Sequence, residues 1–189
     1  MLDRKDQILD VAGELLQTRS FSSFSYQDLS DRIGISKASI HHHFPSKDAL
    51  GKALVERYQS VYRKALEEIS LKHSKPWDQL ETYFAMVGKV IQSGNKICPT
   101  GALQAEHNVI SADMQTEVRA LCKIFHTWLS GVLTDGKKTG AMVFSGTADD
   151  QATLIYVALQ GAMQNARAEG SKPFNAVVRQ LKAGMKTKR

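Results

Sequence analysis

The sequence predicts an all-α fold of about nine helices. Apolar residues recur three and four positions apart along most of the chain, which is the spacing of one buried face on a helix. Residues that cap or end helices divide this pattern into segments of helical length. No segment alternates apolar and polar residues as a half-buried strand does, and no internal repeat is present.

Local signals define the first two helices. The apolar stripe over residues 8–16 has the spacing of a buried helical face. Ser25, with Asp28 three positions later, forms a capping-box pattern that opens a short helix to Ile33. Gly34 ends that helix, because glycine tolerates the left-handed conformation of a helix C-terminal cap.

The third and fourth helices lie on either side of a proline. Ser36 can cap a helix over residues 37–43, and Pro45 ends that helix. Ser46 then opens a long helix of about 23 residues, whose apolar stripe includes Val61.

Similar signals predict five later helices. Pro76 and Pro99 each fit the first turn of a helix, and Thr147 with Asp150 forms a second capping box. The five helices are expected over residues 76–91, 99–107, 114–136, 147–169 and 174–181.

The net charge of +6 does not by itself locate a nucleic-acid site. Residues 1–47 carry six basic and six acidic residues, whereas residues 171–189 carry six basic residues and no acids. No apolar run approaches the roughly 18 residues of a membrane span. Cys98 and Cys122 are too few for a disulfide framework or a zinc cluster, so we expect a cytoplasmic protein without a metal or cofactor.

The two short helices, residues 26–33 and 37–43, have the length and spacing of a helix-turn-helix. In that motif the second helix enters the major groove of DNA. Ile40 and Phe44, four residues apart, face inward from the second helix. The residues left on its outward or flanking faces are Lys37, Ala38, Ser39, His41 and His42.

Three consecutive histidines, His41 to His43, invite a metal-site interpretation. Successive residues on a helix point about 100° apart, so three in a row do not converge on one ion. A packing role suits His43, which lies next to Phe44. For His41 and His42 contact with DNA is the better interpretation, because imidazole bonds to phosphates or base edges and gains charge when protonated.

These residues also carry a resemblance to a known family. The stretch "FSYQDLSDRIGISKASIHHHFPSKDAL" resembles the DNA-binding segment of TetR-family transcriptional regulators, and the match covers residues 6–54. It departs from the family pattern at His41 and His43, where tyrosines are common. The resemblance implies a regulator, by default a repressor, that binds a palindromic operator as a homodimer and is released by a small molecule or an electrophile. It implies a DNA-binding domain over residues 1–47 and a ligand-sensing and dimerisation domain over residues 48–189.

Carried over residue by residue, the resemblance assigns DNA contacts. Tyr26, Gln27 and Lys47 would touch phosphates. His41 would touch a base or a phosphate. The residues facing base edges would be Lys37, Ala38, Ser39 and His42. Phosphate contacts position a protein on DNA, and base contacts specify the sequence.

The last two helices are the candidate dimer interface, mostly on the strength of the resemblance. Small residues allow two helices to approach closely, and two helices from each subunit could form a four-helix contact. The alternative is an ordinary buried helix within one subunit. The predicted interface residues are Leu154, Ala158, Gly161, Ala162, Ala166 and Val178.

Aromatic residues are frequent in the central helices. Taken alone, such residues more often form a core than a pocket, but the resemblance implies a small-molecule site between the middle helices. A few polar groups inside an apolar cavity would orient the ligand. The predicted pocket residues are Tyr83, Cys98, Glu106, His107, Phe125, Trp128, Tyr156 and Gln160.

Cys98 has a second interpretation. It precedes Pro99 at a predicted helix N-terminus, with Lys96 nearby, and both features favour a reactive thiolate. The segment "NKICPTGALQAE" is similar to segments of a TetR subgroup in which some members sense electrophiles. The alternative is that Cys98 is a small, buried packing residue.

Two other classes of function compete with a ligand-responsive regulator. An enzyme is disfavoured because the sequence has no glycine-rich phosphate loop, no GxSxG and no HExxH motif. A DNA-binding architectural protein without a ligand is disfavoured by the long, aromatic-rich region after the helix-turn-helix.

Overall fold

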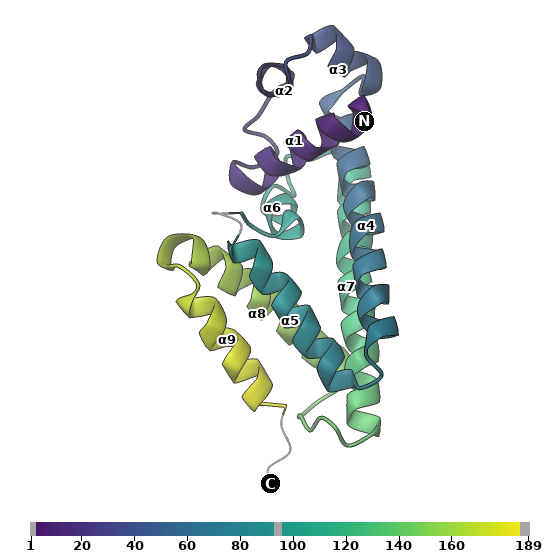
Figure 1. Ribbon diagram of the computed structural model, residues 1–189, viewed down its shortest axis with the longest axis vertical. Coiled ribbons are helices and arrows are strands. Elements are labelled where there is room, and N and C mark those ends of the chain that lie inside the picture. The colour runs from purple at the N-terminus through teal and green to yellow at the C-terminus, as the bar shows by residue number, and fades with distance from the viewer. Residues whose placement is uncertain (1–2, 93–95, 186–189) are drawn as a thin grey trace. The chain divides into compact units, whose positions relative to one another are not determined.

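The computed structural model describes residues 3–92 and 96–185, and in these ranges it contains nine α-helices and no strand (Figure 1). The predicted all-α fold is therefore confirmed. None of the helices in the described ranges has both the length and the apolar character needed to cross a membrane. The helices are α1 (Arg4–Thr18), α2 (Tyr26–Ile33), α3 (Lys37–His43), α4 (Lys47–Lys72), α5 (Pro76–Gln92), α6 (Pro99–Ala105), α7 (Ala112–Lys138), α8 (Ala148–Glu169) and α9 (Lys172–Ala183).

The chain forms two compact units. Residues 1–60 and 96–122 make up the first unit, and residues 61–95 and 123–189 make up the second. Both α4 and α7 contribute residues to each unit. The boundary predicted after residue 47 divides the chain by role, and it stays a prediction.

The first unit has a core of aliphatic side chains from its N-terminal helices. α1 packs against α2 and α6, and α2 packs against α3. Ile8 and Leu16 of α1, Leu29 of α2 and Ile40 of α3 have no exposed surface. The α1 stripe and the inward face of α3 are thus confirmed, and burial of these side chains stabilises the unit through the hydrophobic effect.

The caps predicted around α2 and α3 are present. Ser25 and Asp28 form both hydrogen bonds of a capping box at the start of α2. Gly34 ends α2 with φ 74° and ψ 36°, which is the left-handed conformation. The Ser36 hydroxyl accepts a hydrogen bond from the Ser39 amide and caps α3. Local sequence therefore sets both ends of the turn between the two helices.

The second unit is built around α8. This helix packs against α9 and α5, and it begins with the predicted capping box of Thr147 and Asp150. Lys182 of α9 forms an ion pair with Glu81 of α5, and its ammonium lies 5.6 Å from the ring centre of Phe84. These contacts join α9 to α5.

The apolar stripe predicted for α4 is wrong at one position. Leu50, Leu54 and Ile69 are buried as expected, but Val61 is 53% exposed. The neighbouring Tyr62 contacts Phe125 instead, with ring centres 4.8 Å apart. The buried face of this long helix is therefore shifted by one residue at this point.

Candidate nucleic-acid interface

α2 and α3 are joined by more than their apolar contacts. The Tyr26 hydroxyl at the start of α2 donates a hydrogen bond of 2.8 Å to the carbonyl of Phe44, which ends α3. Burial of the Tyr26 ring raises the pKa of its hydroxyl to about 12, so the group stays protonated and keeps this bond at physiological pH. The bond fixes the two helices to each other.

The outward face of α3 carries the residues predicted to read bases. Lys37, Ala38, His41 and His42 are exposed, and Ser39 is half-buried. The opposite face is anchored by Ile40, which is fully buried. A short helix held from one side thus presents a basic and polar face to solvent, as a recognition helix requires.

The three histidines have different ring contacts. The His41 ring meets the edge of the Tyr26 ring at 4.6 Å between centres, whereas His42 and His43 are 5.5 Å apart at an interplanar angle of 74°. Among residues 3–92 and 96–185, no group of three His, Cys, Asp or Glu side chains could hold a metal ion. His41 is therefore partly oriented by Tyr26, while His42 lies on the exposed face.

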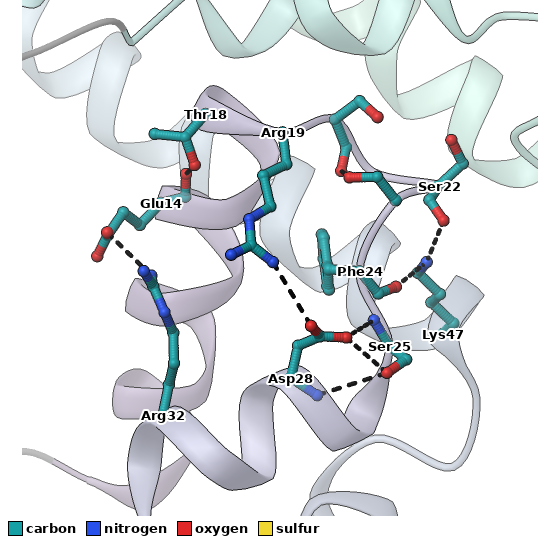
Figure 2. Close-up of polar contacts among 11 residues, drawn as sticks. Glu14, Thr18, Arg19, Ser22, Phe24, Ser25, Asp28, Arg32 and Lys47 are labelled. Carbon is teal, nitrogen blue, oxygen red and sulfur yellow. Dashed lines mark hydrogen bonds and ion pairs between the residues drawn. The ribbon is translucent and has the colours of Figure 1, made fainter.

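Lys47, predicted to bind phosphate, has partners inside the unit (Figure 2). Its ammonium donates to the carbonyls of Ser22, at 3.4 Å, and Phe24. It also lies 5.0 Å from the ring centre of Phe21 and 4.7 Å from that of Phe24. Burial lowers the pKa of Lys47, and the nearby carboxylate of Glu106 opposes this shift. A phosphate contact by Lys47 stays a prediction.

The arginines near this motif are paired with acids. Arg32 of α2 forms an ion pair with Glu14 of α1 at 2.9 Å, and Arg19 forms one with Asp28 at 3.5 Å. Figure 2 shows both pairs. Gln27, also predicted to touch phosphate, donates to Asp31 at 2.6 Å. Exposed ion pairs contribute little stability, so these pairs mainly orient α1 relative to α2.

Comparison with known proteins identifies the family. Residues 8–54, which include the whole of α2 and α3, match the family model described as "Bacterial regulatory proteins, tetR family". The crystal structure of a TetR-family transcriptional regulator from Agrobacterium tumefaciens is 35% identical and has a TM-score of 0.92, over 96% of this chain and 97% of that chain. This chain belongs to the TetR family. It is therefore a DNA-binding transcriptional regulator, and regulators of the TetR family bind operators as dimers.

Among TetR-family proteins, the repressor NemR of Escherichia coli resembles this chain along most of its length. The two sequences are 27% identical over 175 residues, which cover 91% of this chain and 87% of NemR. The crystal structure of the reduced form of E. coli NemR has a TM-score of 0.86, covering 98% of each chain.

The predicted ligand-pocket residues of this TetR-family chain fall into two groups. Tyr83, Phe125, Trp128, Tyr156 and Gln160 belong to the second unit, and Cys98, Glu106 and His107 belong to the first. In the second unit four of the rings form a continuous cluster. The centre-to-centre distances are 5.4 Å for Tyr83–Trp128, 6.5 Å for Tyr83–Phe125 and 6.0 Å for Phe125–Tyr156.

Two further residues belong with this aromatic cluster. Tyr62 contacts Phe125, and Ser70 accepts a 2.8 Å hydrogen bond from the indole nitrogen of Trp128. Neither residue is predicted from the sequence, in which Val61 and not Tyr62 is expected on the buried stripe of α4. The sequence does contain a hint, because the aromatic Tyr62 directly follows Val61 and either residue could lie on the buried face of α4.

The other group lies around α6. Cys98 is half-buried before α6, with its sulfur 2.7 Å from the hydroxyl oxygen of Thr100. The carboxylate of Glu106 binds the loop between α1 and α2, so it does not stand free for a ligand. His107 is exposed.

The predicted dimer residues on α8 lie on two faces. Leu154 is 51% exposed, and Gly161 is exposed with open space above it. Ala162 and Ala166 are buried by the chain's own residues, whereas Ala158 of α8 and Val178 of α9 are half-buried. Val157, which is not among the predicted interface residues, is 54% exposed beside Leu154.

Proposed function

We propose that this TetR-family protein is a repressor that binds a palindromic operator as a homodimer and releases it when an effector binds. The observation that carries the proposal is the outward face of α3, which presents Lys37, His42 and their neighbours while Ile40 anchors the opposite side. The repressor NemR, similar along most of the chain, supports repression rather than activation. Because the operator lies on DNA, we infer a cytoplasmic location.

Within this function, residues 1–47 read DNA and residues 48–189 sense the effector and dimerise. Lys37, Ala38, Ser39 and His42 face base edges, and His41 contacts a base or a phosphate. Tyr26, Gln27 and Lys47 contact phosphates. For Tyr26 and Lys47 this contact requires the internal hydrogen bonds of each side chain to be shared or replaced.

The effector acts by linkage. A ligand that binds more tightly to the DNA-incompetent conformation shifts the dimer towards it, and a coupling of about 1–3 kcal/mol changes DNA affinity roughly 5–150-fold. The ring cluster of Tyr83, Phe125, Trp128 and Tyr156 is the proposed contact surface for an apolar small molecule. α4 begins immediately after the recognition helix, so a change in its tilt would change the separation of the two recognition helices.

Cys98 offers a second trigger, an electrophile or oxidant. The crystal structure of NemR, a similar repressor, is that of its reduced form, and this supports a redox-linked trigger. We expect Cys98 to react faster than Cys122 with a maleimide, and the reaction to release DNA. The Cys122→Ser variant should behave like the wild type, and Cys98→Ser should keep DNA binding but resist release. Release of DNA from Cys98→Ser at the wild-type rate would contradict this role.

Selection of bound duplexes from a random DNA pool tests the proposed function. We expect the wild-type protein to recover a palindrome with two half-sites, because a symmetric dimer places two recognition helices on one duplex. Lys37→Ala should weaken binding by about 1–3 kcal/mol and relax the sequence preference at one position in each half-site. Lys138→Ala, a matched change at the end of α7, should keep the preference. Recovery of unrelated sequences would contradict operator recognition.

A further inference from the structure

Glu106 binds the loop between α1 and α2 by three groups. Its carboxylate accepts hydrogen bonds from the amide of Phe21 at 2.8 Å, from the amide of Ser22 at 3.1 Å and from the Ser22 hydroxyl. Glu106 is the residue that ends α6. A side chain 84 residues away from Ser22 in sequence therefore satisfies two backbone amides of this loop.

Lys47 binds the carbonyl groups of the same loop. Its ammonium reaches the carbonyls of Ser22 and Phe24, as Figure 2 shows. The anion of Glu106 thus takes the loop's hydrogen-bond donors, and the cation of Lys47 takes its acceptors. Charge-assisted hydrogen bonds of this kind are stronger than neutral ones, so the loop is held from both sides.

α6 is tied to the N-terminal helices at its other end as well. The amide of Ile97, just before α6, donates to the carbonyl of Gln17 at 3.2 Å, and the side chain of Gln17 donates back to the carbonyl of Ile97 at 3.0 Å. α6 is consequently bound to α1 before its first residue and to the α1–α2 loop after its last.

The loop held by Glu106 leads directly into the helix-turn-helix formed by α2 and α3. It ends at Ser25, the N-terminal cap of α2, and α2 is bonded to the end of α3 through Tyr26. A shift of the loop would therefore move α2 and α3. Burial opposes the charge of Glu106, but hydrogen bonds from Ser22 and the loop keep its pKa below the usual value, so the carboxylate is ionised at neutral pH.

We propose that Glu106 is a positioning residue for DNA binding: it holds the α1–α2 loop so that α2 and α3 keep the geometry that reads DNA. Glu106 itself does not contact DNA in this assignment.

The direction in which DNA affinity changes when the charge of Glu106 is removed separates this positioning role from a simple electrostatic effect. Removing an acidic group near a DNA-binding motif makes the protein more basic, and charge alone would then strengthen DNA binding. Loss of the loop contact has the opposite effect, because the recognition helix is no longer held in place. Glu106→Gln keeps the size of the side chain while removing its charge, so it distinguishes the two effects.

The experiment compares Glu106→Gln with Glu56→Gln, a matched change at an exposed position of α4 in the same unit. The affinity of each for the duplex selected by the wild-type protein is measured by fluorescence anisotropy at one salt concentration. We expect Glu106→Gln to weaken binding by about fivefold or more, and Glu56→Gln to leave it equal or slightly tighter. Equal or tighter binding by Glu106→Gln would overturn the proposal.

Amide hydrogen exchange tests the contact without DNA. In Glu106→Gln, the amides of Phe21 and Ser22 should exchange faster than in the wild type, while the amide of Ile40 in α3 keeps its protection. Unchanged exchange at the loop would overturn the proposal even if the wild-type protein selected no DNA sequence. If Glu106→Gln fails to fold, Ser22→Ala replaces it. Weaker DNA binding by Ser22→Ala then supports the role, and full affinity overturns it.

Discussion

At the scale of single residues, backbone conformation determines how the two short helices connect. Gly34 has φ 74°, and a Cβ atom added there would meet no other atom within 4 Å. The cost of a side chain at this position therefore comes from the local backbone conformation and not from a clash with another part of the fold. Since α2 and α3 meet at this turn, backbone strain at position 34 would act directly on the helix-turn-helix.

We expect Gly34→Ala to lower the free energy of unfolding by about 1–2 kcal/mol, because an L-residue is strained in the left-handed region. Gly34→Asn should cost less, since asparagine tolerates that conformation better. Gly131→Ala in α7 is a suitable control, because its Cβ also enters open space while its backbone is helical. This control should be stabilised by roughly 0.5–1 kcal/mol. Urea unfolding measures the free energy of unfolding of the three variants. Equal changes for Gly34→Ala and Gly131→Ala would contradict a role for the left-handed backbone at Gly34.

At the scale of helices, the cap of α2 is controlled by one carboxylate. Hydrogen bonds from the Ser25 side chain, and then from its backbone, lower the pKa of Asp28, and Arg19 adds to the effect. Because the folded pKa is depressed, the stabilisation is present above the ordinary carboxyl pKa and is lost as the pH falls through the depressed value. Acid should therefore loosen the start of α2.

Asp28→Asn should accordingly unfold at a lower temperature than the wild type at neutral pH, and the difference should shrink as the pH falls below the ordinary carboxyl pKa and through the depressed pKa of Asp28. Asp31→Asn makes the same charge change on the same helix outside the capping box, and it should lower the melting temperature less at neutral pH. Thermal unfolding followed by circular dichroism across this pH range provides the comparison. A difference for Asp28→Asn that persists in acid would contradict a role for the ionised carboxylate.

Helices and their caps were predictable from the sequence because their signals are local. The two capping boxes each span four positions, and Gly34 follows α2 directly, so each could be predicted from a few neighbouring residues. α6 ends at Ala105, two residues before the predicted end at His107, and the next residue, Glu106, binds a distant loop.

The partners of charged residues were not predictable in this way. Nothing near Glu106 in the sequence indicates that Ser22, 84 residues earlier, holds its carboxylate. Lys47 likewise finds its partner Phe24 at a separation of 23 residues. Such pairs depend on how the first unit packs. The sequence alone therefore suggests a ligand pocket for Glu106 and a phosphate contact for Lys47, and it does not reveal their partners within the unit.

At the scale of the whole molecule, one helix face is suited to a second copy of the chain. Leu154 and Val157 on α8 are 51% and 54% exposed, and Gly161 follows one helical turn later with open space above it. Exposed aliphatic side chains beside a glycine allow another helix to approach closely. Ala162, in contrast, is buried within the chain, so it would enter a dimer contact only indirectly.

We therefore expect Val157→Glu to convert the dimer to monomers in analytical ultracentrifugation, because it would place a charge in an apolar contact between two copies. Operator affinity should fall sharply as well, since a monomer reads only one half-site. Leu71→Glu is the matched control, because Leu71 is 81% exposed on a different helix, α4, and its substitution should leave the dimer intact. If Val157→Glu remained dimeric and bound the full palindrome, the pairing of two recognition helices would have to come from another surface. If it became monomeric yet kept full operator affinity, dimerisation would not be what supplies sequence specificity.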